Sequence, residues 1–204
     1  MGLRALNNPA SDFEDPFAST GLDAVNPKPG PFSASGGIVS EYTDPGGTYR
    51  AHVFTASGSL VVASGDATVE YFVLGGGGGG GTGSGGGGGG AGGFRTNMTG
   101  HPKAPSNPDV FAASTGSYAI VVGIGGDGAH RNPIVGKGLN GTASSVVLSP
   151  TVTVSSQGGA GGGSEGGGFQ PGGNGGSGGG GAYSGPAGEG GSNSQGNDLS
   201  LIHI

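Results

Sequence analysis

The stretch that decides the fold is residues 75–93, GGGGGGGTGSGGGGGGAGG, which directly follows the apolar run VEYFVL at residues 69–74. Its largest side chain is a threonine, so this stretch has almost no apolar surface with which to build a core. A second glycine-rich tract covers residues 158–191 and also follows an apolar run. The chain therefore alternates between segments that can form β-sheet and segments that offer only backbone.

The composition excludes several classes of protein. Of 204 residues, 55 are glycine and 10% are charged, and cysteine is absent, which excludes disulfides and thiolate metal sites. The glycines form runs rather than G-X-Y triplets, which argues against collagen. The formal net charge of −6 argues against a nucleic-acid partner. No apolar stretch approaches the roughly 20 residues of a membrane span, so we expect no membrane insertion.

The rest of the chain predicts an all-β fold, because no window shows helical periodicity and several short runs are rich in β-branched and aromatic residues. The first three runs are separated by Gly58 and by Gly65-Asp66 and are expected to form a meander. Within residues 69–74, positions 69, 71 and 73 alternate with positions 70, 72 and 74, which predicts that one face of this strand is more buried than the other. The predicted strands, which we expect to form a small β-sandwich-like sheet, are residues 49–55, 59–63, 67–74, 117–124, 142–148 and 151–155.

The glycine tracts can adopt one of two structures: a flexible linker, or an ordered bundle of polyglycine II helices. Ordering a glycine costs roughly 0.5–1 kcal/mol more than ordering an alanine. In the extended left-handed helix of three residues per turn, every N–H and C=O points sideways and can bond a neighbouring helix. Each such bond contributes about 0.5–1.5 kcal/mol, so a bundle can hold where a single glycine strand cannot.

The lengths of the runs favour the bundle. Residues 75–81 would span about 20 Å at a rise of about 3.1 Å per residue, close to the length of a six-residue β-strand. The chain would reverse at Thr82-Gly83-Ser84, and residues 85–90 would run back. We therefore predict glycine helices packed with the sheet, in layers of equal depth.

Motifs of catalysis and cofactor binding occur only by coincidence in the glycine tracts, so we expect no enzyme and no cofactor. Residues 123–128 fit G-x-G-x-x-G but precede Ala-His-Arg-Asn-Pro rather than a helix. Residues 162–166 and 175–179 fit G-x-S-x-G without the required strand-to-helix elbow. The histidines show no metal-ligand spacing, so no metal site is expected.

The two ends of the chain differ from the glycine-rich domain, which we place at residues 36–198. Residues 1–35 are proline-punctuated and acidic near Phe13, which predicts an extended N-terminal arm. Residues 199–204, LSLIHI, resemble the translation of an adaptor used in preparing sequencing libraries, and we interpret them as a scar rather than a natural apolar tail.

The order of these features resembles the glycine-rich domain of bacteriophage tail-fibre and virion structural proteins, especially from environmental phages. The resemblance covers residues 38–184 and rests on YRAHVFT at 49–55, VEYFVLGGGGGGG at 69–81, GSYAIVVGIGG at 116–126 and GGNGGSGGGG at 172–181. The opening LNNPASDFEDPFASTGLDAVNP is similar to the N-terminal segment of such proteins.

The resemblance implies a non-enzymatic virion protein, a tail-fibre or tip adhesin located in the virion tail, whose rigid polyglycine scaffold displays host-receptor-binding loops. The expected partners are a host cell-surface glycan or protein, other tail proteins through the N-terminal arm, and further copies of the chain in a homo-oligomer. From their chemistry, loops 94–108 and 127–140 are the candidates for receptor contact, the alternative being ordinary solvated connections. The candidate residues are Phe94, Arg95, His101, Lys103, His130, Arg131, Lys137 and Tyr183.

Two other functions remain open at this point. A glycine-rich protein of the cell surface or extracellular matrix would use the same scaffold without a receptor. An ice-binding protein would need a row of Thr or Ala at a fixed step of three residues, and no such row is visible.

Deletion of Gly78 tests the bundle against the linker. In a bundle, the deletion shifts every following residue of one glycine helix by a third of a turn, so we expect a sharp loss of stability. His130→Ala serves as the control and should leave the melting temperature nearly unchanged. Thermal unfolding measures both, and a deletion without effect would contradict the bundle.

Overall fold

The computed structural model describes residues 31–44, 47–83, 85–102, 104–130, 136–165, 170–183 and 185–187, and the predicted arm up to residue 30 and the suspected scar lie outside them. The described residues form strands and no helix, as the sequence predicts. In chain order the strands are β1 (Ser33–Ser35), β2 (Ile38–Asp44), β3 (Gly47–Val53), β4 (Gly58–Ser64), β5 (Ala67–Val69), β6 (Phe72–Leu74), β7 (Phe94–Thr96), β8 (Phe111–Ala113), β9 (Gly116–Val121), β10 (Ser144–Ser149) and β11 (Val152–Ser156).

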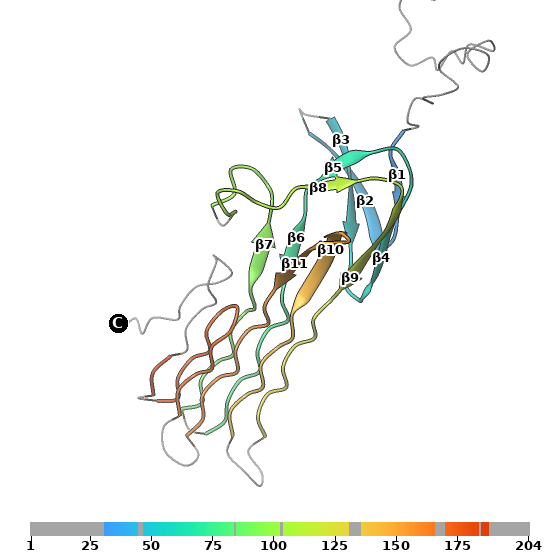
Figure 1. Cartoon of the computed structure of the whole chain (residues 1–204). Coiled ribbons are helices and arrows are strands. Elements are labelled where there is room, and N and C mark those ends of the chain that lie inside the picture. The colour runs from blue at the N-terminus through green and yellow to red at the C-terminus, as the bar shows by residue number, and fades with distance from the viewer. Residues whose placement is uncertain are drawn as a thin grey trace, which may run out of the picture.

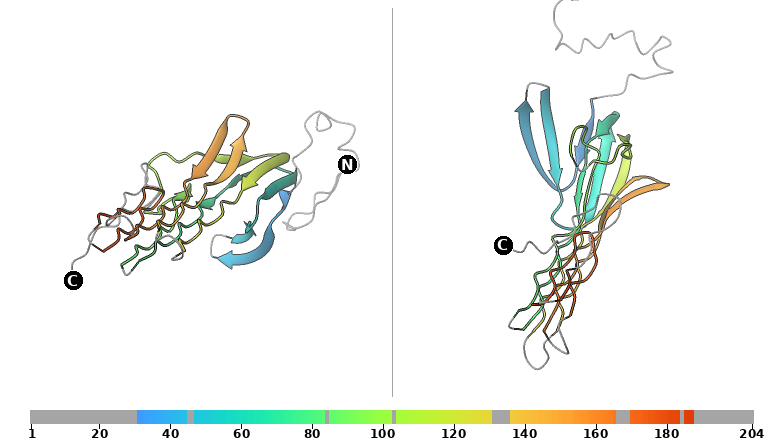
Figure 2. Two further views of the ribbon diagram at one scale, coloured as in Figure 1. Left: turned by 90° about the horizontal axis from the view of Figure 1, so that it is seen from below. Right: turned by 90° about the vertical axis from the view of Figure 1, so that its left-hand side faces the viewer.

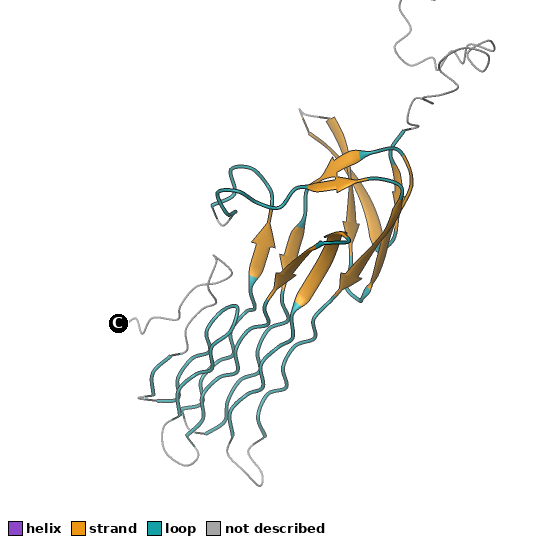
Figure 3. Cartoon of the chain, viewed as in Figure 1, coloured by secondary structure: helices purple, strands orange, loops and turns teal. Residues whose placement is uncertain are grey.

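The strands form one larger sheet and three small ones, all antiparallel. The five-stranded sheet has the order β1-β4-β9-β10-β11, and the two-stranded sheets pair β2 with β3, β5 with β8, and β6 with β7. Figure 1 shows the glycine segments running side by side from the ends of β6, β7, β9, β10 and β11, and Figure 3 shows them as loops continuing those strands. The strands and the glycine segments therefore form two successive tiers of one elongated body.

The predicted meander is wrong. β3 pairs with β2, β4 pairs with β1 and β9, and the single strand predicted at residues 67–74 is divided into β5 and β6. Asn97 causes the division: its Oδ1 accepts from the Tyr71 backbone N–H at 2.8 Å, and its Nδ2 donates to the Val69 carbonyl at 3.0 Å. A side chain therefore replaces a neighbouring strand at this point, and the chain pairs with different partners on either side of it.

The hydrophobic core lies between the five-stranded sheet and the short β5–β8 and β6–β7 pairs. Phe111 is its largest fully buried side chain, and Val62 is equally enclosed. The alternation predicted for residues 69–74 is confirmed, since Val73 is buried while Phe72 and Leu74 are exposed. The other buried members of this cluster are Leu60, Ala113, Val146, Leu148 and Val154.

The glycine segments are held together by backbone hydrogen bonds that recur every third residue. Gly75, Gly78 and Gly81 donate to the carbonyls of residues 93, 90 and 87 at 3.0, 2.7 and 2.8 Å. The falling numbers of the acceptors confirm the predicted reversal after residue 81. A period of three residues is that of the polyproline II helix, so the bond pattern has the spacing predicted for a polyglycine bundle. The segments so bonded are residues 75–82, 85–93, 123–130, 136–142, 157–165, 170–176 and 177–183.

Segment 157–165 is the centre of the bundle, and all residues from 159 to 164 are buried. Its backbone bonds neighbouring segments on all sides, and it runs antiparallel to some of them and parallel to others. Examples of these bonds are Gly159 N to Gly76 O, Gly90 N to Ala160 O, Gly138 N to Gly162 O, Gly173 N to Gly161 O and Gly163 N to Gly180 O, all between 2.7 and 3.0 Å.

Space for a side chain differs between adjacent glycines of one segment. A Cβ on Gly87 would lie 1.9 Å from the carbonyl oxygen of Gly180, whereas a Cβ on Gly88 would meet nothing within 4 Å. Ala91 stands three residues beyond Gly88 and is exposed. The sequence therefore places its one larger residue in this run at a position where the third-residue pattern leaves room.

Gly87→Ala and Gly88→Ala form a matched pair that tests this packing. We expect Gly87→Ala to lower the free energy of unfolding by on the order of 3 kcal/mol, because backbone atoms on both sides would have to move. Gly88→Ala should leave stability unchanged or raise it by up to about 1 kcal/mol, since alanine restricts the unfolded chain. Urea unfolding measures both, and equal effects would show that the segments are not packed as described.

Candidate functional site

The candidate site surrounds β7, where the chain leaves the glycine bundle and re-enters a strand. The Gly93 carbonyl accepts from Gly75, and the next residues pair with β6 in the register Leu74 with Phe94 and Val73 with Arg95. Because side chains alternate across a strand, Phe94 and Arg95 point to opposite faces of the β6–β7 pair. Each face carries a different kind of surface.

Arg95 lines a cleft of 490 Å³ between β7, β11 and the loop that precedes β8. The lining is polar, with a guanidinium, a carboxylate, an amide and several hydroxyls. Such groups can donate to and accept hydrogen bonds from a ligand rich in hydroxyls. The residues around the cleft are Tyr71, Arg95, Thr96, Ala104, Pro105, Ser106, Asn107, Asp109, Thr153, Val154 and Ser155.

Tyr71 fixes one wall of this cleft. Its hydroxyl donates to the Asp109 carbonyl at 3.2 Å, while its backbone carbonyl accepts from Thr96 Oγ1 at 2.8 Å. Burial raises the pKa of the Tyr71 phenol, the negative charge of Asp109 raises it further, and the positive charge of Arg95 lowers it. The Tyr71 phenol therefore stays neutral at physiological pH and can donate its hydrogen bond to the Asp109 carbonyl. This bond holds the loop before β8 against β6.

The opposite face of β6–β7 carries an exposed aromatic group. The Phe94 ring packs edge-on against Phe72, with centroids 4.7 Å apart, and the His101 ring lies 4.9 Å from Phe94 at a tilt of 33°. Phe72 and Leu74 are 55% and 53% exposed, although both are large apolar residues. Exposed apolar patches of this kind mark surfaces that bind other molecules.

The structure brings some of the predicted site residues together and separates others. Phe94, Arg95 and His101 gather at β7. His130, Lys137 and Tyr183 lie at the far end of the bundle, where Ala129 donates to Gly80 and Tyr183 donates to Gly85. Lys103 and Arg131, also predicted, lie outside the described residues.

Tyr183 differs from its surroundings in two respects. It is 77% exposed, and its φ of 44° lies in the left-handed region that residues other than glycine seldom adopt. Its Cβ approaches Gly85 so closely that a Cβ added there would lie 3.1 Å away. Tyr183 therefore ends the last glycine segment with its ring turned to solvent.

The sequence alone did not identify Tyr71, Asp109 or Phe72 as members of the site. Tyr71 and Phe72 belong to a strand-like run, where their β propensity explains them fully. They join Arg95 because a glycine segment leaves after Leu74 and returns at Phe94, which makes β7 the neighbour of β6. In the sequence, only the chain reversal predicted within residues 75–93 indicates that β6 pairs with β7.

The described residues contain no group of three side chains suited to hold a metal ion. None of them belongs to a helix long and apolar enough to cross a membrane. The arrangement at β7 can offer hydrogen bonds and aromatic contacts.

Comparison with known proteins defines the class of this chain. Residues 53–200 match the family model of a glycine-rich domain. This match spans most of the chain, so the protein belongs to that glycine-rich domain family. No curated protein and no solved structure matches the chain.

The raised pKa of Tyr71 predicts a change of stability in alkaline solution. The unfolded phenol titrates near 10, below the folded one, so the contribution to stability is complete below pH 10 and falls as pH rises through the folded pKa. We expect tyrosine absorbance to show one phenol that ionises late, and Tyr71→Phe to remove that component. Tyr42→Phe, on an exposed tyrosine, is the control and should leave the late component in place.

Proposed function

We propose that this protein is a non-enzymatic structural protein of a bacteriophage virion, a tail-fibre or tip adhesin located in the tail. In this proposal the glycine segments are polyglycine II helices that form a rigid stalk, and the surface around β7 contacts a glycan or protein of the host. The phage assignment rests on the resemblance of residues 38–184 to virion glycine-rich domains. Membership of the glycine-rich domain family is compatible with it.

The observation that carries the binding role is the convergence of Arg95 with hydroxyl, amide and carboxylate groups around one cleft. A sugar presents neighbouring hydroxyls that donate and accept at once, and a guanidinium beside a carboxylate matches that pattern. The exposed Phe72 ring and the half-buried Phe94 ring on the other face add apolar contact area. We therefore favour a host glycan as the ligand, bound at the sheet end of the molecule.

Removal of one positive charge at each end of the bundle tests this assignment. Arg95→Ala should weaken binding to a glycan array and to host cells roughly 10-fold or more, because a charge-assisted hydrogen bond contributes about 1.5–3 kcal/mol. Lys137→Ala removes an equal charge from the far end and should leave binding unchanged. If Lys137→Ala weakened binding more than Arg95→Ala did, the binding surface would lie at the far end of the bundle instead. Absence of binding by the unaltered protein would favour the glycine-rich structural protein of a cell surface or matrix, which needs no receptor.

A further inference from the structure

The β2–β3 hairpin has an apolar face that nothing in the described structure covers. Its register pairs Ile38 with Val53, Ser40 with Ala51 and Tyr42 with Tyr49, so these residues share one face. The two tyrosine rings stack with centroids 5.3 Å apart. Ile38 is 64% exposed and Tyr42 53% exposed. We call Ile38, Ser40, Tyr42, Tyr49, Ala51 and Val53 the apolar face of the hairpin.

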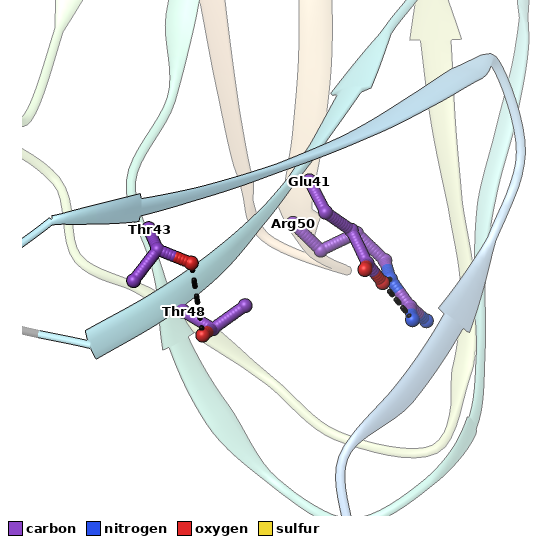
Figure 4. A network of polar contacts seen from close by, with 4 residues as sticks. All are labelled: Glu41, Thr43, Thr48 and Arg50. Carbon is purple, nitrogen blue, oxygen red and sulfur yellow. Dashed lines mark hydrogen bonds and ion pairs between the residues drawn. The ribbon is translucent and has the colours of Figure 1, made fainter.

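The opposite face of the hairpin is polar apart from Val39, and its polar side chains have hydrogen-bond partners. Arg50 Nε donates to Glu41 Oε1 at 3.0 Å, and the Thr43 and Thr48 hydroxyls lie 3.3 Å apart, as Figure 4 shows. The next pair along this face includes His52, whose Nδ1 lies 2.8 Å from the Gly36 carbonyl oxygen. Alternation of an apolar and a polar face is typical of a strand pair with one side packed against another layer.

The body of the protein does not supply that layer. Figure 2 shows the hairpin standing away from the five-stranded sheet, to which it connects through Gly36 and Gly37. Among the described residues, β2 and β3 pair only with each other. At its base the apolar face opens into a notch of 250 Å³ lined by Ile38, Val53 and Phe54, among others. A two-stranded hairpin is marginally stable by itself in water, so a covering partner would stabilise it.

We propose that the apolar face of the hairpin docks against the same face of a second copy of this chain. The formal net charge of −6 makes two copies repel each other in general, so they should meet where charge is absent. None of the six residues of the apolar face is charged, although the register continues this face to the pair of Asp44 and Gly47 at the tip of the hairpin. Glu41 and Arg50 lie on the polar face and neutralise each other. A flat face that bears the same residues in both copies suits a two-fold contact, in which each surface is its own complement.

The position of the hairpin in the chain also favours this occupant. The family match begins at residue 53, at the end of β3, so nearly all of the hairpin lies before the matched range. No backbone hydrogen bond described for the glycine bundle involves residues 38–53, so the hairpin can serve assembly without disturbing the bundle. This inference does not rest on the proposed receptor binding, because the apolar face and the Arg95 cleft are separate surfaces.

Sedimentation analysis of the full chain over micromolar concentrations tests the proposal. We expect the unaltered chain to sediment as a dimer. Tyr42→Asp should weaken dimerisation at least about tenfold, because it brings like charges together in the contact. Thr48→Asp places the same charge on the polar face and should leave the dimer intact. Thermal unfolding of each variant checks that the glycine bundle remains folded.

Crosslinking provides a second readout that does not depend on a disruptive substitution. The chain has no cysteine, so Ser40→Cys introduces a single thiol at the middle of the apolar face with little change of shape. Stacked sheets lie about 10 Å apart, beyond the reach of a disulfide, so a short bismaleimide is the suitable reagent. We expect Ser40→Cys to give crosslinked dimers and Thr48→Cys, on the polar face, to give few.

Several outcomes would overturn the proposal. A chain that remains monomeric at all concentrations would show that another segment, such as the apolar residues of the N-terminal arm, or a different protein covers the face. Equal dissociation by Tyr42→Asp and Thr48→Asp, or a dimer in which Ser40→Cys fails to crosslink, would show that the copies meet elsewhere.

Discussion

The structure depends on one constraint: at many glycines of the bundle, neighbouring backbones approach so closely that a Cβ would have no place between them. A Cβ on Gly161 would lie 1.8 Å from the carbonyl oxygen of Gly138, and one on Gly162 would lie 1.9 Å from that of Gly87. Both glycines belong to the central segment, which bonds neighbours on all sides. Here the hydrogen bonds offset the entropy lost on ordering glycine, and they exist only because side chains are missing.

Because of this constraint, nearly all large polar side chains lie at the ends of the bundle or at solvent-facing positions of its outer segments. Inside, the backbone is occupied with its own hydrogen bonds, and the side chains present there, such as those of Ala160 and Ser164, are small and fully buried. At the sheet end, the strands restore side chains of ordinary size, and Arg95, Tyr71 and Asp109 converge around the cleft there. At the far end, the segments stop at short connections that leave Lys137 and Tyr183 exposed. The side chains of the candidate site at β7 therefore lie outside the glycine bundle.

Much of the fold could be predicted from sequence where the cause is local. The runs that became β4, β9, β10 and β11 are rich in β-branched residues, and the reversal after residue 81 follows from the lengths of the glycine runs. The pairing of strands could not be predicted, because β6 meets β7 and β5 meets β8 across long stretches of chain. The site depends on the same pairings, so Arg95 and His101 were found by their chemistry while Tyr71 and Asp109 were not. The hairpin strand β2 was missed, although its equally exposed partner β3 overlaps the strand predicted at residues 49–55.

In an outer segment of the bundle, the spacing of the residues other than glycine indicates which positions face solvent, which glycine content alone does not. Ile124, Asp127 and His130 are spaced by three and all are exposed, whereas a Cβ on Gly123 or Gly126 would lie within 2.2 Å of a carbonyl oxygen. With three residues per turn, Ile124, Asp127 and His130 form one track that faces solvent, and Gly125 and Gly128 on a second track are also exposed. Large side chains therefore occur on the first track, whereas the track of Gly123 and Gly126 carries no side chain larger than that of Ala129 within segment 123–130. In segment 123–130, the spacing of the residues that interrupt the glycines identifies a solvent-facing row of positions better than glycine content does. An unbroken glycine run does not by itself identify a buried segment, because Gly80 and Gly88 belong to long unbroken runs and are exposed.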